Sequence, residues 1–155
     1  MASEPAVGTI ASRTHVFPLR VYYEDTDAGG VVYYANYLRY AERARGEMLR
    51  AVGIEQRALM ESDGIVFAVR RCEVDYLRPA RLDDALEVVT GNIELEAASL
   101  WAEQVVRRGG DDLVRMRLRL ACVGAGGRPA RLPGYLRAAL APLAKSDATH
   151  KQGRT

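Results

Sequence analysis

Residue types that crosslink chains or hold metal ions are scarce in this sequence. Its 155 residues include two cysteines, Cys72 and Cys122, and two histidines, His15 and His150. The cysteines do not form a Cys-x-x-Cys pair and neither has a histidine beside it, which argues against a zinc site or a disulfide framework. We therefore expect two reduced thiols in strands, no metal ion and no cofactor.

Long hydrophobic runs are also absent. No apolar stretch approaches the roughly 18–20 residues that a membrane-spanning helix requires. The first residues, Met1 to Pro5, have neither the basic segment nor the apolar segment of a secretion signal. These features predict a cytoplasmic protein without a membrane span.

A strong charge of one sign is missing as well. The formal net charge is +2 and the isoelectric point is about 8.6, too small an excess to indicate a nucleic-acid partner. No Gly-x-Ser-x-Gly motif is present, which disfavours a serine hydrolase. The basic residues are mostly arginine, whose guanidinium group also suits contacts with phosphorylated small molecules.

The composition is that of one globular domain. Hydrophobic residues make up 48% and charged residues 27%, an ordinary balance for a folded chain. A chain of this length buries about 68–70% of the surface that its unfolded form exposes, so it needs no crosslinks to fold. We expect a flexible N-terminus at 1–13, one domain at 14–144 and a flexible tail at 145–155.

Apolar residues at helical spacing predict a long amphipathic helix that begins near Tyr33 or Tyr34 and ends before Gly53. The charged residues between them, Arg45 among them, are assigned mostly to the opposite side. Strand-forming residues precede this helix at 14–24, and a shorter helix is expected at 55–61.

The remaining pattern predicts strands at 66–78, 85–97, 99–108 and 112–123. Shifts in the apolar phase between Val69 and Cys72 and around Gly91-Asn92 indicate a bulge or an edge. Gly109-Gly110 predicts a hairpin, and Pro133 can open a short C-terminal helix. Strands that follow one another pair antiparallel, and the long helix must bury its apolar stripe on one face of their sheet. The predicted fold class is therefore α+β, one antiparallel sheet wrapped on one helix.

The segment at 22–37, YYEDTDAGGVVYYANY, carries the candidate chemistry. Acidic residues gather at Glu24, Asp25 and Asp27, and Ala28-Gly29-Gly30 leaves the backbone open to close approach by a substrate. The start of the long helix offers free N–H groups and a partial positive charge. A carboxylate beside such donors is the combination that hydrolysis of an ester or thioester needs.

This segment has two other interpretations besides the catalytic one. An acidic turn that caps the helix, with Gly29-Gly30 making the bend, would need no catalytic role, and the residues alone leave that open. A calcium loop starting at Asp25 fails on spacing, because its twelfth position is Asn36 and not a bidentate glutamate.

The stretch YYEDTDAGGVVYYANYLRYAERARGEML and the later DYLRPARLDDALEV, residues 75–88, resemble one known family. They are similar to the 4-hydroxybenzoyl-CoA thioesterase-like hotdog family, and within it to the acyl-CoA thioesterases associated with the Tol–Pal system (YbgC-like). The resemblance extends over roughly 16–133. It implies a hotdog fold, in which the antiparallel sheet wraps around a long central helix, and hydrolysis of acyl-CoA to a free acid and CoA.

The resemblance also implies site residues. The catalytic aspartate of the family matches Asp27, acting as nucleophile or general base, and the backbone N–H donor at the helix start matches Tyr34. Gly30 and Val31 would line the approach of the substrate, and Tyr23 would lie on the adjoining strand near the carboxylate. The Tol–Pal subgroup usually has histidine at position 34, whereas 4-hydroxybenzoyl-type members have tyrosine there.

The resemblance implies partners too. It predicts an acyl-CoA substrate, with acyl carrier protein as a possible partner, and a homodimer or homotetramer with active sites at the interface. The alternative function is a non-catalytic module of the same fold that binds acyl-CoA or acyl carrier protein. A group of arginines is expected either to contact the CoA phosphates or to form a solvated strand face: Arg70, Arg71, Arg115, Arg117 and Arg119.

Overall fold

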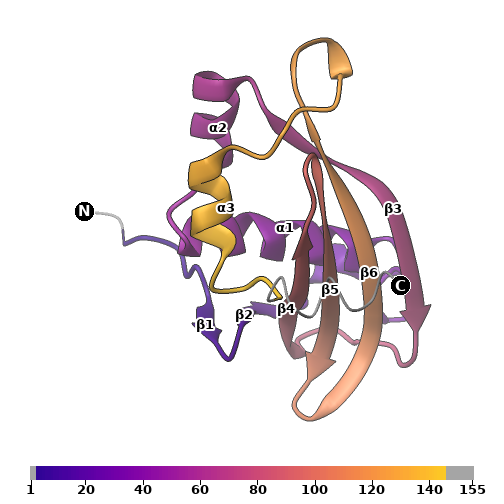
Figure 1. The fold of residues 1–155 in the computed structure, drawn as a ribbon. Helices are drawn as coiled ribbons and strands as arrows, with labels where there is room; N and C mark the ends of the chain where they lie inside the picture. Colours follow the sequence, from indigo (N-terminus) through magenta and orange to yellow (C-terminus); the bar gives the residue numbers. More distant parts are fainter. Residues whose placement is uncertain (1–2, 146–155) are drawn as a thin grey trace, which may run out of the picture.

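A six-stranded antiparallel sheet forms the frame of the domain (Figure 1). The computed structural model describes residues 3–145. The strands lie in the order β1-β2-β4-β5-β6-β3. Their bounds are β1 Thr9–Ala11, β2 Thr14–Arg20, β3 Val66–Tyr76, β4 Ala85–Leu95, β5 Ser99–Arg108 and β6 Asp111–Val123.

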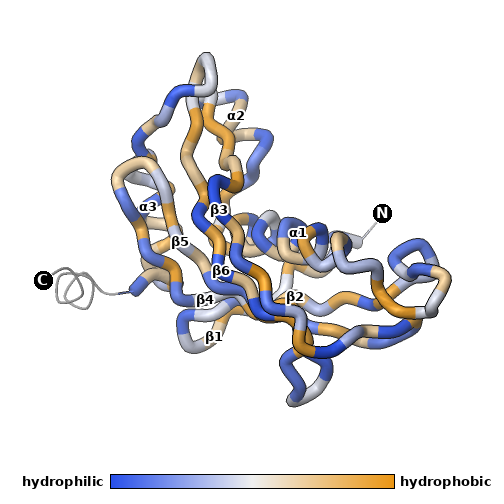
Figure 2. The backbone as a smooth tube through the Cα atoms, turned by 90° about the vertical axis from the view of Figure 1, so that its right-hand side faces the viewer, coloured by the Kyte–Doolittle hydropathy of each residue, from blue (hydrophilic) through white to orange (hydrophobic). Residues whose placement is uncertain are grey.

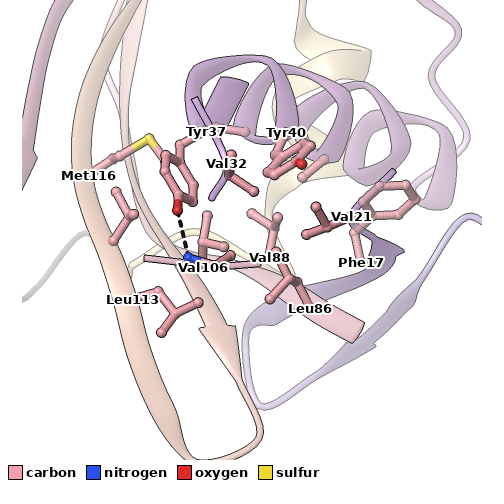
Figure 3. Packing of buried hydrophobic residues seen from close by; sticks show 14 of the residues in the cluster. Phe17, Val21, Val32, Tyr37, Tyr40, Leu86, Val88, Val106, Leu113 and Met116 are labelled. Atoms are coloured by element: carbon pink, nitrogen blue, oxygen red, sulfur yellow. Dashed lines mark hydrogen bonds between the residues drawn. The ribbon is translucent and has the colours of Figure 1, made fainter. Parts of the chain in front are cut away.

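One long helix, α1 Asn36–Ala51, lies against the inner face of this sheet (Figure 1). Tyr37, Tyr40, Ala41 and Ala44 on its apolar side are buried in a core cluster with residues of β2, β4, β5 and β6. Figure 3 shows Tyr37 and Tyr40 among the labelled core side chains below the helix. The helix ends where Gly53 takes a φ of +88°, a left-handed conformation that glycine adopts without strain.

Two shorter helices close the other end of the core. They are α2 Gln56–Asp63 and α3 Gly134–Leu140, and Pro133 takes the position just before α3, as predicted. Leu59 of α2 and Leu136 and Leu140 of α3 pack with Met48 of α1 in a second buried cluster. Single 3₁₀ turns lie at Tyr23–Asp25 (η1) and Ala125–Gly127 (η2). No helix among residues 3–145 combines the length and apolarity needed to cross a bilayer.

The irregularities predicted from the apolar phase are present. The pairing of β3 with β6 shifts between Val69 and Arg71, and that of β4 with β5 shifts between Gly91 and Glu94. Gly109-Gly110 joins β5 to β6. Figure 2 shows hydrophilic and hydrophobic residues alternating along these strands, as expected when one face covers a core.

Several element bounds differ from the prediction. A short strand, β1, occupies Thr9–Ala11 inside the segment expected to be flexible, because it pairs with β2. The first long strand, β2, ends at Arg20 and gives way to the 3₁₀ turn η1. The long helix begins at Asn36, two residues after Tyr34. The residues before it form turns with three-residue spacing, in which the N–H of Asn36 donates to the Tyr33 carbonyl at 2.8 Å and that of Leu38 to the Ala35 carbonyl at 3.2 Å.

Arg45 is on the buried side of α1, although its charge assigned it to the other side. Its Nη1 donates to Oε1 of Gln104 at 3.0 Å. The Gln104 amide in turn donates to the Ala41 carbonyl and to Thr90 Oγ1, both at 3.0 Å. Burial lowers the pKa of Arg45, and the charge is tolerated because this network supplies a hydrogen-bond acceptor.

Replacing Gln104→Ala should therefore destabilise the fold. The change removes the acceptor of a buried guanidinium and should lower the free energy of unfolding by about 3 kcal/mol. Urea denaturation followed by circular dichroism measures this, with Gln56→Ala on the exposed start of α2 as the control. Equal stability of the two variants would contradict the buried network.

Candidate active site

Asp25 fixes the turn that precedes α1. Its carboxylate Oδ2 accepts the N–H of Tyr22 at 2.8 Å. Its carbonyl oxygen accepts two hydrogen bonds, from the N–H of Tyr33 at 3.0 Å and from Nδ2 of Asn36 at 2.8 Å. Burial, together with the nearby Asp25 carboxylate, raises the pKa of Tyr40. Asp25 is thus used in holding the end of β2 to the first turn of the helix.

Asp27 occupies the head of the next turn. Its N–H donates to the Val31 carbonyl at 2.9 Å and its carbonyl accepts the N–H of Gly30 at 3.0 Å. Gly30 has a φ of +77°, and a side chain at Gly29 would lie 3.2 Å from Oδ1 of Asp27. The backbone of this turn therefore favours glycine at 30, and a side chain at 29 would press on the Asp27 carboxylate.

The carboxylate of Asp27 is exposed, and one of its two oxygens accepts a hydrogen bond within residues 3–145. Oδ1 accepts the N–H of Gly29 at 2.8 Å. Oδ2 has no hydrogen-bond partner within residues 3–145. This oxygen faces solvent and keeps its lone pairs available. This arrangement fixes one carboxylate oxygen and leaves the other available to a substrate or a water molecule.

The turn is anchored on the chain between β3 and β4. The N–H of Val32 donates to the Ala80 carbonyl at 2.9 Å, and Val31 forms an isolated bridge with Arg81. The N–H of Ala80 donates to the hydroxyl of Tyr37 at 2.9 Å, the dashed line in Figure 3. Burial raises the pKa of Tyr37, and this backbone hydrogen bond partly offsets the rise.

A hollow of about 260 Å³ opens beside this anchor. Val32, Tyr34, Tyr37, Tyr76 and Leu77 line it together with Arg78 and Pro79. The ring of Tyr34 stands edge-on to that of Tyr76, with centroids 6.2 Å apart, and the Tyr76 hydroxyl donates to the Tyr34 carbonyl at 3.3 Å. The walls are thus mainly apolar and aromatic, as in pockets for small organic groups.

The backbone N–H of Tyr34 is a free donor at the edge of this hollow. It meets no protein acceptor in the part of the chain that the structure describes. Tyr34 precedes the first residue of α1 by two positions, so this N–H belongs to the turn before the helix and not to the helix itself. The predicted donor is therefore available, although the helix begins later than expected.

The residues predicted from the sequence fall into two groups. Asp27, Gly30 and Val31 form one turn, and Tyr34 lines the hollow beside it. Tyr23 was expected on a strand near the carboxylate but lies in η1, where its side chain is 82% exposed. Tyr76 was not predicted as a site residue. Its place at the hollow depends on the pairing of β3 with β6 and on the path of the chain after β3.

Metal ligands do not gather in this region. Within residues 3–145, no group of three or more histidine, cysteine, aspartate or glutamate side chains could hold an ion. The two aspartates have different roles. Asp25 accepts hydrogen bonds from backbone N–H groups, and Asp27 faces outward.

One antiparallel sheet wrapped on a long helix, with a carboxylate turn at the helix start, defines an α+β protein of the hotdog class. The family model of the thioesterase-like superfamily matches residues 21–140. The chain belongs to this superfamily.

Two curated relatives are similar over most of the chain. The acyl-CoA thioesterase YbgC of Haemophilus influenzae is 44% identical over 124 residues, which cover 79% of this chain and 91% of the relative. The acyl-CoA thioester hydrolase YbgC of Escherichia coli O6:H1 is 45% identical over 108 residues, covering 69% and 80%.

Solved structures agree with the fold. A probable thioesterase from Bartonella henselae is 39% identical and superposes with a TM-score of 0.74, covering 77% of this chain and 99% of that one. A 4-hydroxybenzoyl-CoA thioesterase in complex with 4-hydroxybenzoyl-CoA has a TM-score of 0.76 at 24% identity, over 83% and 99% of the two chains. The predicted hotdog fold and family are confirmed.

The different tasks of the two aspartates can be separated by stability measurements. Asp25→Ala removes the acceptor of the Tyr22 N–H and should lower the free energy of unfolding by about 1–2 kcal/mol. Asp27→Asn keeps an oxygen that can accept the Gly29 N–H, so its stability should stay within about 0.5 kcal/mol of the native protein. Thermal and urea denaturation measure both, and a larger loss for Asp27→Asn would contradict this assignment.

Proposed function

We propose that this chain is an acyl-CoA thioesterase that uses Asp27 as its catalytic carboxylate. The observation that carries the proposal is the exposed Asp27 carboxylate on a turn whose backbone is held at both ends, close in the chain to a free N–H at Tyr34. The family and the names of the two YbgC relatives support an acyl-CoA substrate. CoA thioesters are intracellular metabolites, which fits the expected cytoplasmic location.

Asp27 can promote hydrolysis in two ways. As a nucleophile, Oδ2 attacks the thioester carbonyl carbon, the C–S bond breaks, and CoA leaves as the thiolate; water then cleaves the resulting anhydride. As a general base, Asp27 takes a proton from a water molecule that attacks the same carbon. In both routes the thiolate is a good leaving group, so a dedicated general acid is not required.

The N–H of Tyr34 would stabilise the negative charge that develops on the carbonyl oxygen. One such donor contributes about 3–4 kcal/mol to the transition state in related reactions. The peptide that carries this N–H is held by its Tyr33 carbonyl, which accepts the N–H of Asn36 at 2.8 Å, and the Tyr76 hydroxyl holds the Tyr34 carbonyl that follows it. Gly30 and Val31 would line the approach to the carboxylate, and Tyr23 would lie at its outer edge.

The hollow beside Tyr34 is the proposed site for the acyl group. Its aromatic and aliphatic walls exclude water from the carbonyl region and favour an apolar acyl chain or ring. Tyr34, Tyr37 and Tyr76 surround it through ring contacts of 5.9–6.2 Å.

Asp27→Asn should abolish thiol release from a panel of short, long and aromatic acyl-CoAs while the native protein hydrolyses at least one of them. The expected loss in kcat is at least about 10³-fold, because the amide is neither a nucleophile nor a base. Glu24→Gln is the matched control, since it also converts a carboxylate to an amide, on an exposed residue of the preceding turn η1. Normal turnover by Asp27→Asn would refute the mechanism, and inactivity of the native protein on acyl-CoA and acyl carrier protein thioesters would favour a binding module.

We also propose that two copies pair through β3. This strand is an edge of the sheet, and its 11 residues leave one row of backbone groups unpaired. Val69 and Tyr76 pair with Leu120 and Val114 of β6 and so lie on the core face, yet they are 49% and 47% exposed because α1 covers other strands. A second copy would cover both the edge and this apolar face, and pairs of such dimers would give the tetramer.

Sedimentation equilibrium tests the dimer. The native protein should sediment at twice or four times the 17.1 kDa mass of the chain. Val69→Asp adds a charge to the exposed apolar face and should shift the protein to a monomer, while Glu73→Gln on the opposite face of the same strand should not. A native protein that stays monomeric at micromolar concentration would contradict the proposal.

A further inference from the structure

The N–H of Tyr34, the proposed donor to the thioester carbonyl oxygen, belongs to the peptide that joins Tyr33 to Tyr34. The orientation of this peptide depends on how Tyr33 is held. The N–H of Tyr33 donates to the Asp25 carbonyl at 3.0 Å, and the Tyr33 carbonyl accepts the N–H of Asn36 at 2.8 Å. Tyr33 is therefore fixed on both sides, by the segment before the Asp27 turn and by the first residue of α1.

The side chain of Asn36 closes these contacts into a hydrogen-bond triangle. Its Nδ2 donates at 2.8 Å to the Asp25 carbonyl, the same oxygen that accepts the Tyr33 N–H. Each of the three residues is thus joined to the other two: Asp25, Tyr33 and Asn36. A closed set of contacts restricts rotation of the Tyr33 backbone more than any one of them alone, because each limits the motion that the others leave open.

The triangle needs a hydrogen-bond donor at position 36. The side chain there faces a carbonyl oxygen, and the asparagine amide supplies N–H donors to it. The half-buried position leaves less water to replace that donor. An aspartate would suit the start of a helix, since negative charge is favoured there, but an ionised carboxylate cannot donate. The amide of Asn36 is therefore required by the triangle and not by the helix.

Other contacts hold the donor peptide less directly. The Tyr76 hydroxyl donates to the Tyr34 carbonyl at 3.3 Å, which is a long hydrogen bond at an exposed site and acts on the next peptide along the chain. The Tyr34 side chain is 60% exposed, and its ring meets those of Tyr33 and Tyr76 at centroid distances of 4.8 and 6.2 Å. Within residues 3–145, the orientation of the donor peptide therefore depends chiefly on the triangle.

The triangle also relates the donor peptide to the carboxylate. The segments 25–27 and 31–33 run antiparallel side by side, joined by backbone hydrogen bonds on either side of the turn. The triangle lies at the open end of this pair of segments, where the chain enters α1. Because the Asp27 turn has its own anchor on Ala80, loss of the triangle would move the Tyr34 N–H while the carboxylate stays in place.

We infer that Asn36 is a positioning residue, which holds the Tyr34 N–H in the orientation that stabilises the charge developing on the thioester carbonyl oxygen. This inference rests on the proposed thioesterase function. Asn36 acts through the peptide between Tyr33 and Tyr34 and not through contact with the substrate. Because the donor is needed when charge develops in the transition state, its misplacement should lower kcat and leave KM unchanged.

Two substitutions at position 36 test this role by kinetics on an acyl-CoA that the native protein hydrolyses. Asn36→Ala removes one side of the triangle and should lower kcat roughly tenfold. Asn36→Asp sets a carboxylate against the Asp25 carbonyl and should lower kcat about 10²-fold, the effect of a misplacement of about 1 Å. KM should change less than about twofold in both variants. Gln56→Glu makes the matched amide-to-acid change at the first residue of α2 and should keep the native kcat. Circular dichroism checks that each variant is folded at the assay temperature.

Amide hydrogen exchange tests the triangle without requiring turnover. The N–H of Tyr33 should exchange at least about tenfold faster in Asn36→Asp than in the native protein. The N–H of Val32, which donates to Ala80, should keep its native rate and serves as the internal reference.

The two measurements separate the possible failures. Unchanged exchange at Tyr33 would overturn the triangle whatever the activity. An unchanged kcat in Asn36→Asp, or a higher KM at native kcat, would overturn the positioning role even if exchange is faster. A native protein that hydrolyses no acyl-CoA would overturn the proposed function, and the positioning role with it, even if the exchange rates support the triangle.

Discussion

The hydrogen bonds of Ala80 are the constraint on which the rest of the site depends. Its carbonyl accepts the N–H of Val32 and its N–H donates to the Tyr37 hydroxyl. These two contacts join three segments that are distant in the chain: the turn before α1, the helix itself and the connection into β4. Because Ala80 is fully buried, its polar groups must be paired, and pairing them places the Asp27 turn at one position against the sheet.

The same constraint separates the roles of neighbouring acidic residues. Asp25 has its carboxylate and carbonyl bound to backbone and side-chain donors, so its oxygens are used in the fold. Asp27 is two residues further on, at the head of a turn whose base is already fixed, and keeps one free oxygen. Identical side chains thus have a structural role and a proposed catalytic role because they lie in two successive turns, Asp25 in η1 and Asp27 in the next.

Local pattern predicted most of the fold because the elements are amphipathic and regular. The phase shifts near Val69 and Gly91 were visible in the sequence, since a bulge moves every later side chain to the opposite face. The start of α1 was placed too early, because the spacing of Tyr33 and Tyr37 does not reveal that the Tyr33 carbonyl accepts the N–H of Asn36, three residues on, in a turn before the helix. Arg45 was assigned to the surface because its acceptor, Gln104, lies 59 residues away.

The sequence predicted only the part of the candidate site that lies within one short segment of the chain. Asp27, Gly30 and Val31 belong to one short turn, and the resemblance to a family identified them together. Tyr76 could not be found in this way, because its place at the hollow depends on strand order. In the sheet β3 pairs with β6, although β4 and β5 lie between them in the chain, and this non-local pairing fixes the position of Tyr76.

The position of β3 also explains why a chain of this size would work as a pair. One helix of 16 residues is about 24 Å long and packs over β2, β4 and β5, which leaves the core face of the last strand open. Closing that face within one chain would require another helix, whereas the proposed second copy would close it with structure that already exists. Antiparallel pairing reverses the direction of the edge, so the two ends of each sheet exchange neighbours. The proposed pairing would therefore cover the unpaired β3 edge and the exposed apolar face of both copies at once.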